Sequence, residues 1–310
     1  MKHGHQASTP EGLRCKRSRD RPAAIKHRQE AFTLVELIVT IVISSIVVSF
    51  MAMFVAGPIA AFDDQTRRAE LVDLAENALR RLARDVRRAL PNSVRVTATG
   101  GTVALEMLNS VDGVRYREQP PPADPDSQLD FSSADGAFNS VGQFTSITRP
   151  FSSTNHYLSI YNVGVPGADA YELANVITPA NTRIDIDDAA TPGEDRITLT
   201  PSFRFAFGSP GQRLFLVDGP VTYLCDPGAG TLRRYAGYSI TADQSSRDSH
   251  AELVGAGATE TLITNRVSAC ELNYAPGTAQ RAGLVTLTIS VSEAGETVSL
   301  LHQVHVDNVP

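Results

Sequence analysis

The sequence predicts an α+β protein in which a long N-terminal helix packs on a β-rich globular domain of antiparallel sheet. Residues 37–62 form an uncharged run of 26 residues, and residues 63–90 then carry apolar side chains at three- and four-residue spacing, the pattern of an amphipathic helix. From residue 93 onward, short runs of apolar and hydroxyl-bearing residues alternate with turns of Gly, Pro and Asp, as in antiparallel strands. The 310 residues are therefore predicted to divide into segments 1–31, 32–62, 63–91 and 92–310.

Residues 1–31 form a basic segment ahead of the apolar run. They hold eight Lys and Arg residues against three acidic residues, and they contain no apolar run of their own. Because a basic flank of a membrane span stays in the cytoplasm, we expect this segment inside the cell and the chain after residue 62 outside it. A secretory signal fits poorly, because its apolar stretch is shorter and ends at a small-residue cleavage site.

The apolar run is long enough to cross a membrane, and it begins beside one acidic residue. As a helix, its 26 residues would extend about 39 Å, and a hydrocarbon core is about 30 Å thick. A carboxylate such as that of Glu36 is rare in this setting unless a cation pairs with it; the alternative is that it reaches the headgroup region from the helix start. Gly57 and Pro58 are predicted to kink the helix, because Pro removes a backbone hydrogen bond.

The residues around Glu36 resemble a known processing site. Ala31 is followed at 32–37 by Phe-Thr-Leu-Val-Glu-Leu, a string similar to the cleavage site of type IV pilins and type II secretion pseudopilins. The resemblance implies cleavage between Ala31 and Phe32, N-methylation of Phe32, and pairing of the Glu36 carboxylate with the Phe32 amine of a neighbouring subunit. Such an amine is mostly protonated at neutral pH, so the pair would relieve two charges in an apolar surrounding. The family usually has Gly where this chain has Ala31.

The same resemblance implies partners and a location. The expected partners are a prepilin peptidase and methyltransferase, other minor and major pilins that contact the stem helix, and an inner-membrane assembly platform. The chain would cross the inner membrane once with its N-terminus in the cytoplasm, and would later enter a periplasmic or extracellular pilus. The expected function is that of a minor pilin in type IV pilus assembly, at initiation or at the tip.

A narrower resemblance is spread along the mature chain. It is to the MshO family of minor pilins in mannose-sensitive haemagglutinin (MSHA) pili. One alternative is a minor pseudopilin of type II secretion, and a second is a single-pass membrane-anchored periplasmic protein. The blocks that carry the narrower resemblance are residues 80–93, 223–225, 232–238 and 300–308.

The stem and the strands can be placed by their local patterns. The helix is predicted to run on to Leu90 and to end at Pro91. A final hairpin, 284–291 with 298–306, is expected to be a central element of one sheet around a single core. The stem carries possible ion pairs four residues apart at 63–67, 64–68, 76–80 and 81–85. The other predicted strands are 94–99 and 102–108 around Gly100-Gly101, then 157–163, 196–199, 214–217, 221–224 and 231–235.

The three cysteines are expected in two different cellular compartments. Cys15 lies in the basic leader, whereas Cys225 and Cys270 lie in the exported domain, where thiol pairs are usually oxidised. We therefore expect a disulfide between Cys225 and Cys270. Two buried, unpaired thiols are the alternative, because sequence does not show that the two side chains meet.

The composition and motifs favour a protein that is not an enzyme. No nucleophile, metalloprotease or phosphate-loop motif occurs in the sequence, and His302 and His305 are expected on opposite faces of a strand. Removing residues 1–31 lowers Lys and Arg from 28 to 20 and acids from 34 to 31, a net charge of −11, which argues against nucleic acid as a partner. No cofactor is expected. Ca²⁺ is a weak candidate at Asp185, Asp187 and Asp188, where a solvated acidic turn is the favoured alternative.

Overall fold

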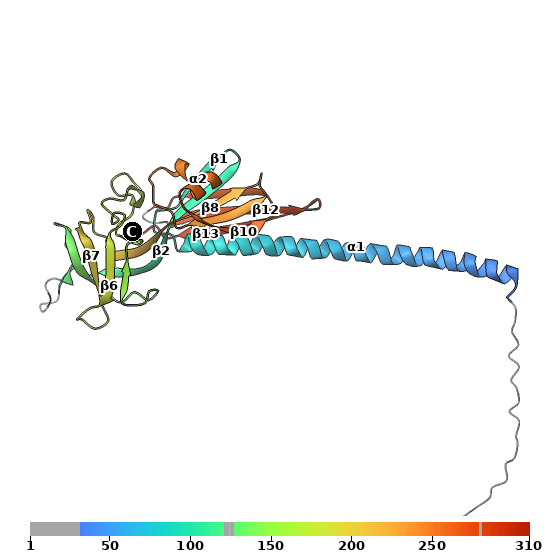
Figure 1. Cartoon of the computed structure of the whole chain (residues 1–310), viewed down its shortest axis with the longest axis horizontal. Coiled ribbons are helices and arrows are strands. Elements are labelled where there is room, and N and C mark those ends of the chain that lie inside the picture. The colour runs from blue at the N-terminus through green and yellow to red at the C-terminus, as the bar shows by residue number, and fades with distance from the viewer. Residues whose placement is uncertain (1–31, 121–123, 125–126, 279–280) are drawn as a thin grey trace, which may run out of the picture. The chain divides into compact units, whose positions relative to one another are not determined.

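The computed structural model describes residues 32–120, 124, 127–278 and 281–310 (Figure 1). The described chain divides into two units, a first that ends at residue 60 and a second of residues 61–310. Helix α1 (Leu34–Arg87) contributes residues to both units, and the strands follow in the second unit. The predicted α+β class, with one stem helix ahead of a β-rich domain, is confirmed.

Within the second unit, the later part of α1 buries one face against strands. Leu71, Leu82 and Val86 are fully buried, and their spacing places them on one side of the helix. They belong to one core with Leu105 and Tyr223 of the neighbouring strands. The amphipathic pattern read from the sequence is therefore the face that holds the stem to its domain.

The helix ends at Arg87, three residues before the predicted end at Leu90. The Leu90 N–H donates to the Leu108 oxygen at 2.8 Å, and Ala89 forms a β-bridge with Asn109. Pairing with a strand therefore takes the backbone away from the helix before Pro91 does. This long-range partner explains why the local pattern placed the end too late.

Two antiparallel sheets make up the β-rich domain. The larger has the order β10-β9-β8-β2-β3-β7-β6-β4, with β1 paired to β2 and β5 paired to β8, and the smaller has the order β11-β12-β13. The strands of the larger sheet are β1 (Arg95–Thr99), β2 (Thr102–Tyr116), β3 (Asp135–Val141), β4 (Phe151–Ser153), β5 (Tyr157–Ser159), β6 (Arg183–Asp188), β7 (Asp195–Phe203), β8 (Arg213–Asp226), β9 (Thr231–Ala236) and β10 (Thr259–Asn265). The smaller sheet is formed by β11 (Val267–Ala275), β12 (Gly283–Glu293) and β13 (Glu296–Val306). The short helices are η2 (Ala170–Glu172), η3 (Gln244–Ser246) and α2 (His250–Gly255).

The prediction that the final hairpin is a central element of one sheet around a single core is wrong, because the hairpin belongs to the smaller of two sheets. It consists of β12 and β13, and β13 is an edge strand of the three-stranded sheet. Val285, Leu287 and Ile289 point into the core shared with α1, while the alternate hydroxyl residues lie on the other face. The alternation was read correctly, but it does not reveal how many strands join the hairpin.

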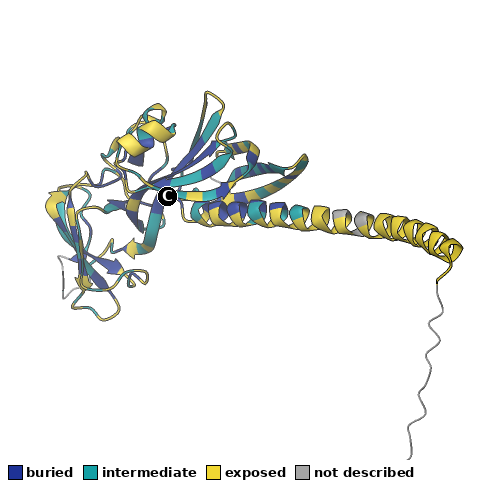
Figure 2. Ribbon diagram, turned by 45° about the vertical axis from the view of Figure 1, so that its right-hand side comes forward, coloured by how far each residue is buried: buried dark blue, intermediate teal, exposed yellow. Residues whose placement is uncertain are grey.

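The expected single core is also divided. Leu71 and its neighbours on α1 lie in one cluster with the three-stranded sheet, whereas Phe138, Ile186 and Ile197 of β3, β6 and β7 lie in another. Figure 2 shows buried residues on both sheets. Length alone predicted enough residues for one core, and the long strands β2 and β8 extend that core into a second cluster.

Candidate functional site

The start of the stem is capped by its own sequence. Thr33 directly precedes α1, and its hydroxyl oxygen accepts the Glu36 N–H at 3.3 Å. A Thr in this position satisfies one of the N–H groups that the first helical turn leaves without a partner. The sequence analysis missed this role, although Thr-x-x-Glu is the usual signal of a helix N-terminus. Thr33 therefore fixes where the helix begins, at Leu34, two residues after Phe32.

The expected cleavage lies just ahead of this cap. Phe32 is described and its side chain is 72% exposed, while Ala31 lies outside the described residues. Cleavage between the two residues stays a prediction. Because Phe32 is exposed and precedes the capped helix, an enzyme can reach the bond before it without unfolding the stem.

Glu36 is placed in the first turn of α1 with its side chain exposed. Its carboxylate makes no ion pair within the described part of the chain. Negative charge in the first turn is favoured by the helix dipole, but that interaction leaves the carboxylate oxygens available. The geometry is therefore that of an acid open to an external cation.

Within the described residues, the apolar part of the stem packs against no other segment of the chain. Leu34–Val55 is 22 residues long with a mean hydropathy of 2.6, and none of it is buried (Figure 2). At 1.5 Å per residue it extends about 33 Å, which matches a hydrocarbon core. Among the described helices, this one alone is long and apolar enough to cross a membrane. Such a surface requires lipid or other apolar helices around it.

The comparisons with known proteins identify a motif at the start of this apolar helix. Residues 26–52 match the family model of the prokaryotic N-terminal methylation motif. The chain carries a prepilin-type signal. Neither the curated proteins nor the solved structures gave a match. The motif supports a type IV pilin-like structural protein that is processed by a prepilin peptidase and assembles with other pilins.

The predicted kink has no counterpart in the helix assignment. Gly57 and Pro58 both lie inside α1, which continues to Arg87 without an interruption. A bend at these two residues stays a prediction.

A disulfide joins the two sheets of the domain. Cys225 in β8 and Cys270 in β11 are bonded, with their Cα atoms 6.5 Å apart. β8 belongs to the larger sheet and β11 to the smaller one, so the bond ties together elements that share the core beneath α1. The expected pairing is thus present, and its role is structural.

At the Ca²⁺ candidate residues, two of the three carboxylates are held by arginines. Asp185, Asp187 and Asp188 follow one another along β6; Asp185 pairs with Arg183 and Asp188 with Arg149. No group of three or more His, Cys, Asp or Glu side chains in the described residues is arranged to hold a metal ion.

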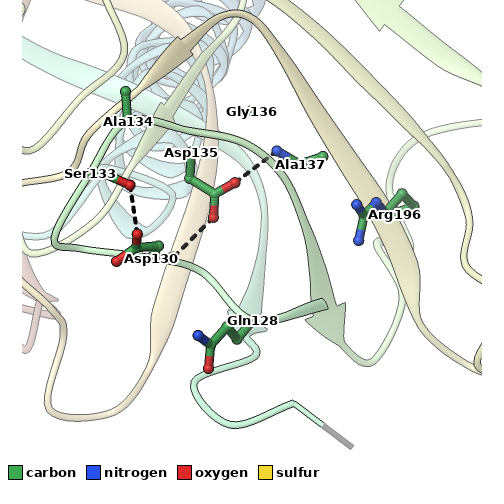
Figure 3. Close-up of a pocket in the computed structure, with 8 residues that line it drawn as sticks. All are labelled: Gln128, Asp130, Ser133, Ala134, Asp135, Gly136, Ala137 and Arg196. Carbon is green, nitrogen blue, oxygen red and sulfur yellow. Dashed lines mark hydrogen bonds between the residues drawn. The ribbon is translucent and has the colours of Figure 1, made fainter. Parts of the chain in front are cut away.

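A polar hollow lies at β3 (Figure 3). It has a volume of about 520 Å³. Asp135 accepts the backbone N–H groups of Asp130 and Ala137, and Asp130 accepts the hydroxyl groups of Ser132 and Ser133. The Ser133 hydrogen bond is the largest cause that lowers the pKa of Asp130 to about 2. These carboxylates are used to build a turn, which explains their arrangement without a ligand.

A cluster of arginines at the end of the stem was not predicted as a site. They line a hollow of about 630 Å³, here called the arginine hollow. Its one acid, Asp85, accepts hydrogen bonds from Arg234 at 2.7 Å and from the Tyr223 hydroxyl at 2.9 Å. Four of the arginines are close in sequence, but Arg234 comes from β9 and is brought in by the fold. The lining residues are Asn77, Arg80, Arg81, Arg84, Asp85, Arg88 and Arg234.

The buried ion pair between Arg95 of β1 and Glu106 of β2 serves the fold. Glu106 is fully buried and receives Arg95 at 2.7 Å and the Tyr238 hydroxyl at 3.0 Å, while Arg95 also lies over the ring of Tyr171. Burial raises the pKa of the Glu106 carboxyl, and Arg95 opposes the shift. Every polar atom in this group has a partner inside the domain, so it offers nothing to a substrate.

Proposed function

We propose that this chain is a minor pilin that takes part in the assembly of a type IV pilus. One observation carries the proposal: the N-terminal methylation motif at 26–52 coincides with an exposed apolar helix. Glu36, the acid in the first turn of that helix, has its carboxylate open to an external cation. An amine at the start of a neighbouring stem is the cation that this position suits.

The finer assignment is to MSHA pili, with the chain acting as an MshO-like subunit at initiation or at the tip. Its support is the resemblance of four blocks, from the end of the stem to the last strand, together with the large size of the second unit, residues 61–310. Pili of this type are named after an adhesion activity, and the chain would contribute to adhesion through the filament. The expected partners are the processing peptidase, major and minor pilins, and the inner-membrane platform.

Assembly follows from two physical properties of the stem. Cleavage would leave a cationic amine on Phe32, which can pair with Glu36 of the neighbour and thereby set the axial register. The apolar span would exchange lipid contacts for contacts with other apolar stems, so its solvation changes little. Glu36 therefore supplies specificity, while the apolar surface supplies most of the contact.

The proposal is tested by the mass and N-terminal residue of the full chain, expressed with and without its prepilin peptidase. The expected product begins at N-methylated Phe32 only when the peptidase is present. Ala31→Gly is the matched control and should be processed at least as well, whereas Ala31→Leu should block cleavage. An intact leader in the presence of an active peptidase would instead favour the single-pass anchored protein.

The choice between pilus and secretion system needs a separate measurement, since both families share the methylation motif. We expect deletion of the gene to reduce surface pili and to leave type II secretion unchanged. Loss of secretion with normal pili would favour the minor pseudopilin.

A further inference from the structure

The arginine hollow carries more positive charge than the neighbouring acids neutralise. Five of its lining residues are arginines and one, Asp85, is an acid. A second acid, Glu76, holds Arg80 at 2.5 Å from outside the lining, so an excess of three positive charges remains. Within the described residues, Arg81 and Arg84 make no hydrogen bond or ion pair. Both side chains are exposed, so their guanidinium groups can meet a ligand directly.

The fold also fixes one wall of the hollow. Arg234 reaches it from β9 and donates through Nε to Asp85 at 2.7 Å. The Tyr223 hydroxyl donates to the same carboxylate oxygen at 2.9 Å. These bonds hold Arg234, whose side chain is 22% exposed. Because a guanidinium has five N–H donors, the bond to Asp85 leaves donors of Arg234 for a ligand in the hollow.

The helix alone gives little reason for this concentration of arginines. Arg84 and Arg87 lie in the last turn of α1, where the partly negative helix end favours cations, but this effect fades within one turn. Arg80 and Arg81 come before that turn. Arg80 and Arg84 are also four residues apart, and like charges at this spacing destabilise a helix. A cluster that the helix itself disfavours points to an anion from outside the chain.

We propose that the arginine hollow binds a diphosphate group, either in a free compound or in the head group of a membrane lipid. The planar fork of an arginine matches two phosphate oxygens at once. A phosphate ester carries a charge of about −1.5 to −2 at neutral pH, so two phosphates together offset the excess of three positive charges. A single carboxylate offsets only one of them. The volume of about 630 Å³ leaves room for both phosphates between the arginines.

Nucleic acid fits the hollow less well than a compact anion does. Proteins that hold single strands usually stack the bases on aromatic side chains, and none of the lining residues is aromatic. A long polyanion would also extend past the arginines onto a chain whose net charge is negative. A compact anion meets the local positive charge alone. The inference concerns the second unit and does not depend on the pilin assignment.

The test is calorimetric titration of inorganic pyrophosphate into the full chain, held in nanodiscs of neutral phosphatidylcholine. We expect binding at one site that weakens as salt is added, because charged groups supply the contacts. Succinate is the matched ligand, a compact anion with two carboxylates in place of phosphates. It should bind about tenfold more weakly, since it offers the arginines fewer charge-assisted hydrogen bonds. Absence of pyrophosphate binding, or equal binding of succinate, would overturn the proposal.

Two matched arginine variants locate the site. Arg84→Gln should weaken pyrophosphate binding about fivefold. Arg87→Gln, an equal change in the same exposed turn but outside the lining, should leave the affinity unchanged. Arg84→Lys should lie between wild type and Arg84→Gln, because it keeps the charge and loses the fork. Equal losses in the two Gln variants, or no loss in either, as for binding to the basic residues 1–31, would contradict the proposal.

A second ligand distinguishes the two sources of the diphosphate. Geranyl diphosphate carries the same group on a short isoprenyl chain, and its uptake by empty nanodiscs is subtracted. Tighter binding than that of pyrophosphate, with the same loss in Arg84→Gln, would support a lipid head group. Equal or weaker binding with that loss would support a free diphosphate. Binding of geranyl diphosphate that Arg84→Gln leaves unchanged would show that the chain is held by the bilayer and not by the hollow, and would overturn the lipid head group as the source.

Discussion

Glu36 is the residue whose replacement separates processing from assembly. We expect Glu36→Ala to be cleaved normally, because the change leaves residues 26–35 of the motif and the Thr33 cap in place. Its incorporation into pili should fall strongly, because the neighbour's amine would lie in an apolar surrounding without a counter-charge. The measurement is the amount of variant in sheared pili relative to processed protein in membranes. Wild-type recovery of the variant would show that the carboxylate has no part in assembly.

His156 predicts a pH dependence of stability. Its ring accepts or donates a hydrogen bond with Ser153 at 2.7 Å. Burial lowers its pKa from the ordinary value of 6.5, and Asp218 opposes the shift. The unfolded chain therefore binds more protons than the folded chain just below pH 6.5, and stability is lost as the pH falls through that range. Because the ring is only half buried, we expect about 0.5 kcal/mol or less.

The measurement for His156 is thermal unfolding at pH 5 and pH 7.5. The difference in Tm between the two pH values should shrink in His156→Asn relative to the wild type. His305→Asn is the matched control, since that side chain is exposed on β13. An unchanged difference in His156→Asn would contradict the assignment.

At the scale of elements, the disulfide predicts how the two sheets depend on each other. Cys225 and Cys270 are separated by 45 residues, and closing a loop of that length stabilises the folded chain by about 4 kcal/mol in the loop-entropy model. We expect Cys225→Ala with Cys270→Ser to unfold at a clearly lower urea concentration than the wild type. Adding reductant should lower the wild type to the same midpoint and leave the variant unchanged. Equal midpoints without reductant would show that packing alone holds the sheets.

The elements that could be predicted are those set by neighbouring residues. The hairpin of β1 and β2 turns at Gly100 and Gly101, both at positive φ, and such turns are visible in sequence. The strand expected at 157–163 stops at Ser159, because Tyr161 takes a left-handed conformation. The two strands expected at 214–217 and 221–224 are one strand, β8. The register between β8 and β2 shifts at Asp218 of β8 and again at Val111 of β2, and these two irregularities allow the ladder to continue past the Asp-Gly-Pro segment.

The ion pairs of the stem also show that local sequence patterns do not predict contacts with distant strands. Of the four predicted pairs, Arg80 with Glu76 is present at 2.5 Å. Arg68 instead pairs with Glu296 of β13, and Asp85 pairs with Arg234 of β9. A spacing of four residues identifies what can meet on an isolated helix. Strands that pack beside the helix offer better-placed partners, and the sequence does not say which strands those are.

At the scale of the whole molecule, the chain combines a site that is local in sequence with one that is not. The prepilin-type motif lies in a short stretch and is recognisable from sequence alone, whereas the cap formed by Thr33 was missed. The arginine hollow depends on Arg234, which is 146 residues from Arg88 in the chain. Net charge was also a poor guide here, because a mature chain of charge −11 concentrates arginines on one short part of its stem.

The division into two units predicts which truncations fold. A chain of residues 61–310 retains the compact second unit and every residue of the core shared by α1 and the strands, which begins at Leu71. We expect this fragment to be soluble, to form the disulfide, and to unfold in one cooperative transition. A chain of residues 93–310 should fail, because it lacks Leu71, Leu82 and Val86 and exposes the inward faces of both sheets.

The two fragments differ only in the amphipathic stem, so they form a matched pair. The measurements are urea unfolding followed by circular dichroism, and the mass shift on thiol labelling, which reports the disulfide. Removing a single buried Leu costs about 2–5 kcal/mol, so the loss of a whole helix face exceeds the 5–15 kcal/mol that keeps a typical domain folded. If residues 93–310 unfolded as cooperatively as residues 61–310, the stem would be a tether beside a self-sufficient domain. If the shorter fragment fails to fold, as we expect, the second half of the stem is a structural part of the domain. A force on the stem, or a fixed axial position of the stem, would then be transmitted directly to the β-rich core.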